Sequence, residues 1–170
     1  MLLALDLATN TGWCKGDSTK RPTSDSLRLP KTGDDVGAFL FAWESELKEI
    51  AKGATKIVFE SPITYLQKAN NKTITKLHSI AGVTELFCHK RQIPCFMAQP
   101  STIKKAWLGE FKLMRGATSK EKKAPMIDRA KALGFDPQDS DEADAIALWF
   151  YAVTKGAGPT ACEQLVKSWR

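Results

Sequence analysis

Short apolar runs separated by polar turns open the chain. Residues 2–8 (LLALDLA) form one such run, a turn follows at 9–12, and a second strand is predicted from about Trp13. The stretch 16–30 is polar and contains two prolines, so we expect a loop there, with an edge strand around 26–29. This pattern predicts an N-terminus rich in strands.

Helical patterns alternate with single strands in the middle of the chain. Apolar residues recur at steps of three and four over 33–52, which predicts an amphipathic helix that ends at Gly53. A β-branched run at 56–60 (KIVFE) predicts a strand, a long helical pattern follows over 65–89, and 93–98 (IPCFMA) predicts another buried strand.

The last third of the chain is predicted to be helical. We expect a short helix over 102–107, a basic helix over 120–133, and an apolar-rich helix over 140–151 that Ser140 could cap. The tail 156–170, which begins with a Gly- and Pro-rich stretch, has enough helical pattern for one or two further turns.

The order of these elements predicts an α/β fold. Consecutive strands at the N-terminus indicate a hairpin, whereas strands separated by helices indicate parallel pairing. We therefore expect a mixed central β-sheet of about five strands with helices on both faces.

The positive net charge of the chain indicates which class of partner it binds. The net charge of the 170-residue chain is +6 and its isoelectric point lies near 9.2, which favours a polyanionic partner. No apolar run approaches the ~20 residues that span a membrane. The N-terminal apolar run lacks a basic start and is interrupted by Asp6, so we expect no secretion signal and a cytoplasmic location.

The cysteines predict no metal site. Cys14, Cys88, Cys95 and Cys162 form no CxxC pair, and the two histidines add no helical HxxxH partner. We expect four free thiols.

Two acidic residues belong to predicted apolar strands. Asp6 lies within the first apolar run, and Glu60 directly follows Ile57–Phe59. A charge in such surroundings is costly unless a partner compensates it. Two adjacent strands that each present a carboxylate would repel one another, and a divalent cation such as Mg²⁺ relieves that repulsion.

A second acidic pair begins the helix predicted over 140–151. Asp141 and Asp144 are spaced i, i+3, so they share one face at the helix start, where the macrodipole favours negative charge. Acidic residues in a first turn are also common helix caps, and this interpretation stays open for either residue alone. Asp139 and Glu142 are rival carboxylates, for which we expect solvated surface roles.

Four carboxylates from three segments suit a two-metal site. In such a site, cations roughly 4 Å apart activate a water molecule and stabilise the leaving oxygen of a phosphodiester. The sequence contains no GxxxxGK[ST] loop, no GxSxG turn and no HExxH motif, so no competing chemistry is indicated.

Three motifs carry a family resemblance. LALDLATNTGW, IVFESPITYLQKANNKTITKLHSIAGV and SDEADAIALWFYA together cover most of residues 2–152, and in them the chain resembles the RuvC-type Holliday junction resolvases of the RNase H-like superfamily. The resemblance implies a nuclease domain over 1–155 with a C-terminal tail at 156–170. The catalytic set of that family falls here on Asp6, Glu60, Asp141 and Asp144.

The resemblance also implies cofactor, partner and place. It implies two Mg²⁺ ions per active site, replaceable by Mn²⁺, and a homodimer formed through the long central helix. The implied partner is branched DNA, in recombination and repair, within a bacterial or phage-infected cytoplasm.

Two departures from the family pattern resemble phage-encoded or divergent members. The usual D-P-G is replaced by Asp6–Leu7–Ala8, and the residues after Glu60 are not the Phe that bacterial enzymes place against the junction. Tyr65 is the nearest aromatic residue that could substitute.

Basic residues supply candidate DNA contacts. Lys68, Lys72 and Lys76 are spaced four apart, which fits either a solvated helix face or a stripe that tracks phosphates. A second cluster spans residues 101–131. It holds nine basic residues: Lys104, Lys105, Lys112, Arg115, Lys120, Lys122, Lys123, Arg129 and Lys131.

The resemblance assigns two members of this cluster a closer role. Lys104 and Lys122 match the family's basic residues near the scissile phosphate, with Lys120 or Lys123 as alternatives to Lys122. The other DNA contacts expected here are Lys105, Lys112 and Arg115. The tryptophans at 13, 107 and 149 are expected in the core.

The leading hypothesis is a Mg²⁺-dependent endonuclease that resolves four-way DNA junctions and leaves 5′-phosphate and 3′-hydroxyl ends. A less selective nuclease on flaps, Y-junctions or RNA/DNA hybrids is the second hypothesis. The third is a non-catalytic protein that binds branched DNA.

Overall fold

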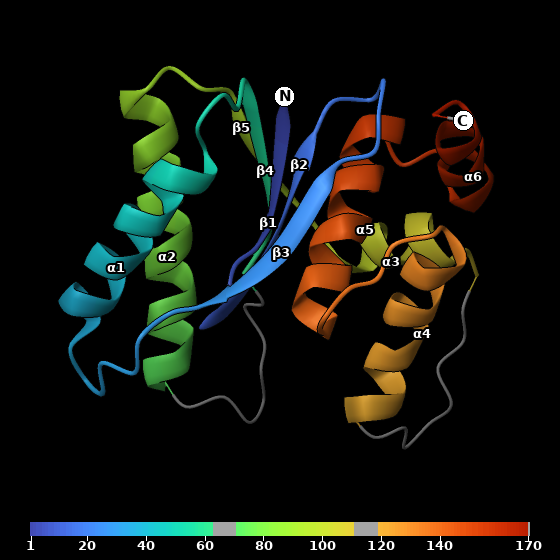
Figure 1. The fold of residues 1–170 in the computed structure, drawn as a ribbon. Helices are drawn as coiled ribbons and strands as arrows, with labels where there is room; N and C mark the ends of the chain where they lie inside the picture. The colour runs from blue at the N-terminus through green and yellow to red at the C-terminus, as the bar shows by residue number, and fades with distance from the viewer. Residues whose placement is uncertain (63–70, 111–118, 170) are drawn as a thin grey trace.

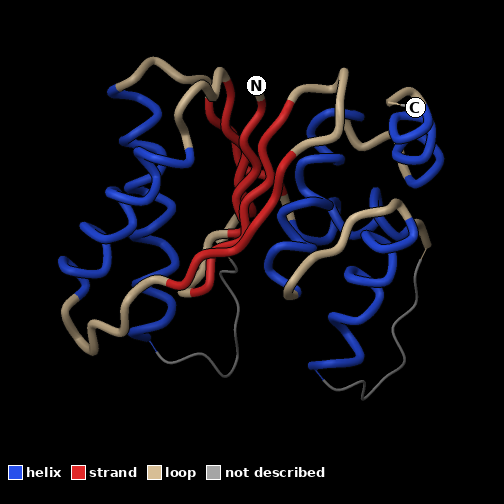
Figure 2. Tube along the Cα trace, viewed as in Figure 1, coloured by secondary structure: helices blue, strands red, loops and turns tan. Residues whose placement is uncertain are grey.

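A five-stranded mixed sheet forms the centre of the protein (Figures 1 and 2). The computed structural model describes residues 1–62, 71–110 and 119–169. The strand order is β3-β2-β1-β4-β5, so the predicted mixed sheet is confirmed. The strands are β1 (Leu2–Asp6), β2 (Asn10–Gly16), β3 (Thr23–Arg28), β4 (Lys56–Glu60) and β5 (Cys95–Ala98).

Strand direction follows from the length of the connections. The N-terminal strands β1, β2 and β3 are joined by short links and pair antiparallel. β4 pairs parallel with β1 and with β5, because a helix separates each of these strands in sequence. β1 thus lies in the middle of the sheet, and Leu3, Ala4 and Leu5 are fully buried.

Helices cover both faces of this sheet. Figure 1 shows α1 (Val36–Ile50) and α2 (Asn71–Lys90) on one face. On the other face α5 packs directly on the strands, and the remaining helices surround it. These helices are α3 (Pro100–Leu108), α4 (Ser119–Ala132), α5 (Ser140–Thr154) and α6 (Pro159–Lys167).

Alternation along the strands divides the core in two. Leu3 and Leu5 of β1 pack with Ile57 and Phe59 of β4 in the cluster shared with α1 and α2. The residues between them, such as Ala4 and Val58, belong to the cluster under α5. Positions with even numbers on β1 and β4 therefore face α5, which decides where Asp6 and Glu60 point.

The C-terminal helix α6 packs on the same core as α5. Cys162 is buried, and the Trp169 ring lies 5.9–6.5 Å from the rings of Phe135, Trp149 and Phe150. Its indole Nε1 donates to the carbonyl of Ser18 at 3.0 Å. The sequence predicted the helical turns in this tail but not their packing.

Several predicted boundaries shift in the structure. β2 begins at Asn10, three residues earlier than expected, and β3 begins at Thr23. α2 begins at Asn71 within the described residues, so the part of the predicted helix at 65–70 lies outside them. The cap of α5 is Asp139, so the assignment of Ser140 as the cap was wrong.

Other expectations are confirmed. All four cysteines are free. Trp107 of α3 and Trp149 of α5 are buried in the same core cluster, and Trp13 packs partly buried against the α1 and α2 core. Among the described helices, none is both long and apolar enough to cross a membrane.

Candidate metal centre

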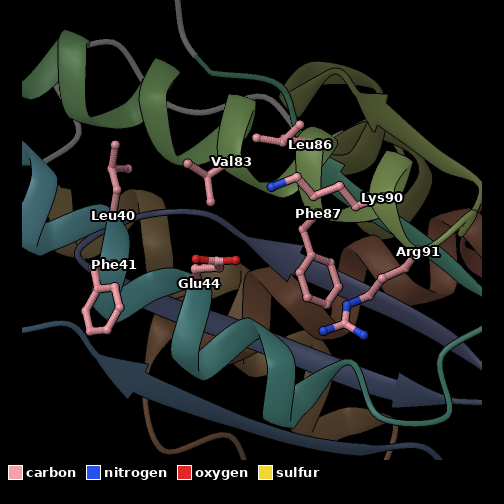
Figure 3. Close-up of a pocket in the computed structure, with 8 residues that line it drawn as sticks. All are labelled: Leu40, Phe41, Glu44, Val83, Leu86, Phe87, Lys90 and Arg91. Atoms are coloured by element: carbon pink, nitrogen blue, oxygen red, sulfur yellow. The ribbon is translucent and has the colours of Figure 1, made fainter.

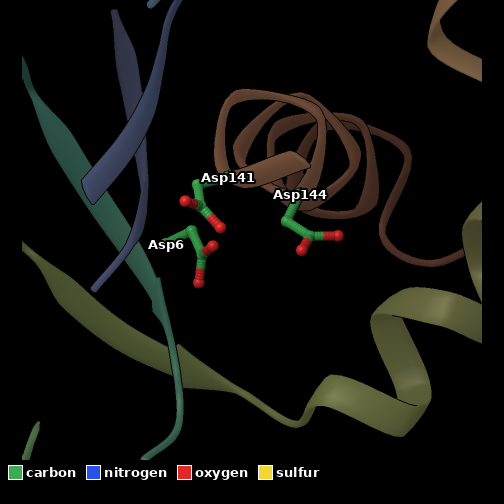
Figure 4. A group of neighbouring side chains, drawn as sticks. All are labelled: Asp6, Asp141 and Asp144. Atoms are coloured by element: carbon green, nitrogen blue, oxygen red, sulfur yellow. The ribbon is translucent and has the colours of Figure 1, made fainter. Parts of the chain in front are cut away.

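Three aspartates meet where β1 ends and α5 begins. Figure 4 shows Asp6 pointing from the strand toward Asp141 and Asp144 on the first turns of the helix. One carboxylate oxygen from each residue lies within 4.8 Å of the other two. The structure thus brings together three of the four acidic residues that the sequence singled out.

Glu60 lies beside this group without joining it. It is the last residue of β4, one position beyond the pair Leu5–Phe59, and so lies next to Asp6 in the parallel register. After burial, the charge of Asp144 raises the pKa of Glu60, and the charge of Glu60 is one of those that raise the pKa of Asp6. Glu60 therefore contributes to the acidic field at the edge of the aspartate group.

The helix cap fixes the position of Asp141 and Asp144. The Oδ1 atom of Asp139 accepts hydrogen bonds from the backbone N–H groups of Asp141 at 3.0 Å and Glu142 at 2.8 Å. The i, i+3 spacing then places both aspartates on the helix side that faces β1. Ala143, which lies between them, is fully buried.

The expectation of solvated roles for Asp139 and Glu142 was wrong. Asp139 caps α5, and Glu142 is only 5% exposed. The carboxylate of Glu142 accepts from the Ser24 hydroxyl and from the backbone N–H of Gln138, each at 2.7 Å. Both residues face β3 and its surroundings, because α5 packs on β2 and β3 as well as on β1.

Polar residues on the hairpin hold this cap, and sequence reasoning missed them. The side-chain nitrogen Nδ2 of Asn10 donates to Asp141 at 2.6 Å and to Asp139 at 3.0 Å. The Ser26 hydroxyl donates to Asp139 at 2.6 Å. Asn10 and Ser26 have even numbers on β2 and β3, so the strand register seen in the structure places both on the face toward α5, but the sequence does not reveal that register.

Crowded acidic groups change their pKa values at this site. Burial, followed by the charges of Asp144, Glu60 and Asp141, raises the pKa of Asp6 well above its usual range, against the effect of Lys123. Burial and then the charge of Asp144 raise the pKa of Glu60 to about 7, while Lys104 lowers it.

Asp144 follows the same pattern. Burial raises its pKa to about 6, against the lowering effects of Lys104 and Lys123. Its Oδ1 atom is buried and has no hydrogen-bond partner among the described residues. A buried carboxylate oxygen without a donor is costly unless a cation binds it.

The donor set fits a divalent cation. The group offers oxygen atoms alone, which is the ligand type that Mg²⁺ and Mn²⁺ prefer. An ion bound between the aspartates would offset their mutual repulsion and satisfy Asp144 Oδ1. The residues present therefore fit the metal that the sequence led us to expect.

Two lysines on the neighbouring helices α3 and α4 act on the acidic group. Lys123 of α4 places Nζ 2.8 Å from the Ser140 hydroxyl and 3.3 Å from Asp141 Oδ1. Lys104 of α3 acts on Glu60 and Asp144 through its charge. Lys120 and Lys122 lie in the first turn of α4, but their side chains lie outside the described part of the structure.

The lysine stripe on α2 contacts the segment before α1. Lys72 Nζ pairs with Asp34 at 2.7 Å, and Lys76 Nζ donates to the carbonyl of Gly33 at 2.8 Å. The Lys76 ammonium also lies 5.2 Å from the centre of the Phe39 ring. Lys105 is exposed on α3, whereas four further expected contacts lie outside the described residues: Lys68, Tyr65, Lys112 and Arg115.

Comparison with known proteins starts from a short sequence match. No family model matches the chain. Over 82 residues it is 33% identical to the crossover junction endodeoxyribonuclease RuvC of Corynebacterium glutamicum, covering 48% of this chain and 35% of that protein. The match therefore spans about a third of the length of that relative.

Solved structures match nearly the whole chain. T. thermophilus RuvC in complex with a Holliday junction substrate gives a TM-score of 0.63 at 16% identity, over 93% of this chain and 98% of that one. A second Thermus thermophilus RuvC structure gives 0.58 at 18% identity over the same shares. The yeast mitochondrial Holliday junction resolvase Ydc2 gives 0.54 at 12% identity, over 99% of this chain and 81% of that one.

The chain has the RuvC fold. The mixed RNase H-like sheet with helices on both faces, expected from the resemblance, is confirmed. Within the RuvC fold of this chain, β1 and α5 supply the aspartate group, β4 adds Glu60, and α3 and α4 each bring a lysine to its rim.

Proposed function

We propose that this protein is a divalent-metal-dependent endonuclease that cuts branched DNA, with the four-way Holliday junction as its substrate. The observation that carries the proposal is the group of three aspartates, one oxygen of each within 4.8 Å of the others, in a chain with the RuvC fold. One of the matched RuvC structures is a complex with a Holliday junction substrate, which supports the choice of DNA.

The acidic residues hold the metal in this proposal. Asp6, Asp141 and Asp144 would bind Mg²⁺, with Mn²⁺ as a substitute, and Glu60 would complete a site for two ions. Ions held by these residues would supply the activation of a water molecule and the stabilisation of the leaving 3′ oxygen, so the products would carry 5′-phosphate and 3′-hydroxyl ends. The unpartnered Oδ1 of Asp144 supports this assignment.

Lysines at the rim would meet the scissile phosphate. The charges of Lys104 and Lys123 already influence the acidic group. In the reaction, these positive charges would stabilise the negative charge that develops on the scissile phosphate. The other basic residues expected from the sequence, Lys122 among them, would add phosphate contacts that depend on salt.

A homodimer is part of the proposal, because cutting two strands symmetrically needs two sites. A groove of about 480 Å³ lies between α1 and α2, and Phe41 and Leu86 are among the residues that line it (Figure 3). These two side chains are 71% and 50% exposed. Glu44 lies in the same groove as Lys90 and Arg91, so two copies related by a two-fold axis could pair opposite charges around an apolar centre.

The dimer has its own test. We expect Leu86→Glu to shift the protein from dimer to monomer in analytical ultracentrifugation, while Glu46→Lys, a change at an exposed α1 residue outside the groove, leaves the dimer intact. A monomeric wild-type protein in the presence of junction DNA would refute this part of the proposal.

Cleavage of matched substrates tests the main proposal. Labelled four-way, three-way and flap DNA are incubated with Mg²⁺ or Mn²⁺, and the four-way junction should be cut at symmetric positions. Asp144→Asn should abolish cutting but retain junction binding, whereas Asp136→Asn, an exposed change shortly before α5, should cut like wild type.

The outcomes separate the competing functions. A four-way junction that stays intact while flaps or RNA/DNA hybrids are cut would favour the less selective nuclease. Junction binding without cutting in either metal would favour a non-catalytic binding protein.

A further inference from the structure

Asn10 lies between the carboxylate of Asp139, which caps α5, and the carboxylate of Asp141, which belongs to the aspartate group. Its Nδ2 atom is 2.6 Å from Asp141 Oδ2, in the aspartate group, and 3.0 Å from Asp139 Oδ2, in the helix cap. A primary amide has two N–H donors on one nitrogen, so a single Asn side chain can serve both acceptors at once.

No charged residue could replace this amide equally well. An acid at position 10 would add a further negative charge to the carboxylates already present, and a lysine would neutralise the charge that a metal ion needs. The neutral amide holds the two carboxylates close without adding charge of either sign. Its chemistry therefore suits a residue that orients a ligand without competing for the cation.

The backbone of Asn10 is held firmly enough to orient a neighbour. Asn10 is the first residue of β2 and lies opposite Arg28 in the hairpin. Two residues further, Gly12 lies against the backbone of Asp141, so this strand and the first turn of α5 are in direct contact. The amide thus reaches Asp141 from the sheet, whereas Ser140 and Lys123 reach the other oxygen of Asp141 from the helices.

The other hydrogen bonds of Asp139 belong to the helix cap alone and do not involve the aspartate group. Asp139 Oδ1 binds the backbone of α5, and Oδ2 also accepts from the Ser26 hydroxyl. Ser26 therefore supports the cap alone, while Asn10 supports both the cap and Asp141. This difference allows a matched comparison between the two side chains.

We propose that Asn10 is a positioning residue of the metal centre, which fixes the Asp141 carboxylate in the orientation that lets it bind a divalent cation together with Asp6 and Asp144. The inference rests on the proposed metal-dependent function and deepens it. Partners that orient metal ligands commonly contribute about 10- to 100-fold to metal affinity.

Metal binding without DNA tests this inference. The affinity of metal-stripped protein for Mn²⁺ is measured by titration calorimetry for wild type, Asn10→Ala and Ser26→Ala, and thermal unfolding is recorded for each. We expect Asn10→Ala to bind Mn²⁺ about tenfold more weakly, and Ser26→Ala to stay within about twofold of wild type, although both weaken the cap.

Each outcome decides between the two proposals. Equal affinities in wild type and Asn10→Ala, or an equal loss in both variants, would overturn the positioning role. If wild type binds no Mn²⁺, the metal centre itself fails and takes this inference with it. If wild type binds Mn²⁺ but cuts no DNA, the proposed nuclease fails while the expected difference between the variants still supports the role of Asn10.

Discussion

Gly12 on β2 and Asp141 on α5 approach so closely that no side chain fits between them. A Cβ atom on Gly12 would lie 1.9 Å from the carbonyl oxygen of Asp141 and 2.8 Å from the backbone nitrogen of Glu142. In the sheet, Gly12 is also the partner of Asp6. One glycine therefore lets the helix that carries two aspartates touch the strand pair that carries the third.

Replacing this glycine should disturb both stability and the site. We expect Gly12→Ala to lower the free energy of unfolding by about 2–3 kcal/mol, because α5 has to move away from β2. A displacement on the order of 1 Å should also slow DNA cleavage about 100-fold. Chemical denaturation and single-turnover cleavage measure the two effects.

A second glycine serves as the control. Gly82 is exposed on α2, and a Cβ atom there would meet nothing within 4 Å. We expect Gly82→Ala to stabilise the protein by about 0.5–1 kcal/mol and to leave cleavage unchanged. Wild-type stability and rate in Gly12→Ala would contradict the close approach of helix and strand.

The raised pKa of Glu60 should make stability depend on pH. Burial and then the charge of Asp144 raise this pKa to about 7, whereas an unfolded chain keeps a value near ~4.3. Between these values the folded protein binds more protons than the unfolded chain, so rising pH lowers the free energy of unfolding. We expect Glu60→Gln to gain stability relative to wild type from about pH 5 to about pH 8, measured by thermal unfolding in a chelator.

An exposed glutamate tests whether this effect belongs to the site. Glu46 is exposed on α1, and Glu46→Gln should follow the wild-type pH profile throughout. Parallel pH profiles for Glu60→Gln and wild type would mean that the charged Glu60 carboxylate does not destabilise the folded protein.

Neighbouring lysines on α3 should differ in their effect on cleavage. The charge of Lys104 lowers the pKa of both Glu60 and Asp144, against the larger raising effect of burial, so we expect its ammonium to stabilise negative charge at the acidic group. We expect Lys104→Ala to reduce the single-turnover rate about 100-fold, because a positive charge near the reacting phosphate is lost.

Lys105 is the matched control for this change, since it is the exposed neighbour on the same helix. Lys105→Ala should change the rate by less than about threefold, and each variant should reduce the salt dependence of binding by at most about one phosphate contact. Equal cleavage rates in the two variants would show that Lys104 has no specific role in the reaction.

The packing of Trp169, which follows α6, predicts that the C-terminal tail supports the fold. Its indole contacts the rings of Phe135, Trp149 and Phe150 and donates to Ser18. We expect Trp169→Ala to lower the free energy of unfolding by about 3 kcal/mol, measured by urea denaturation. The exposed neighbour change Lys167→Ala should stay within about 0.5 kcal/mol, and equal stability of both variants would mean that the tail is dispensable.

Sequence patterns could place the acidic residues because they follow buried ones at fixed steps. Asp6 comes two residues after Ala4 and Glu60 two after Val58, so both point to the face that Ala4 and Val58 occupy. On α5, the i, i+3 spacing of Asp141 and Asp144 puts both side chains on one face of the helix. Alternation and helical period are local, and a sequence displays them directly.

The residues that hold these acids gave no such signal. β3 reads TSDSLR, where polar residues occupy both faces, so nothing distinguishes Ser26 from its neighbours. Asn10 precedes the apolar part of β2, and its role depends on the register of the hairpin against α5. For the same reason Glu142 looked like a surface acid: its partner Ser24 is 118 positions away in the chain.

The burial of α5 has a consequence for how the proposed nuclease would choose its substrate. Apart from Asp144, every residue of this helix from Glu142 to Phe150 is buried, and the sheet and the outer helices enclose it. A helix held in this way cannot tilt or slide without breaking a close-packed core, so the distance from its aspartates to Asp6 is as stiff as the interior itself. The DNA, and not the protein, would then have to deform to bring its phosphate to this fixed point. Discrimination between branched and linear substrates would be decided by the elastic energy of the nucleic acid, which is lowest where a junction is already bent.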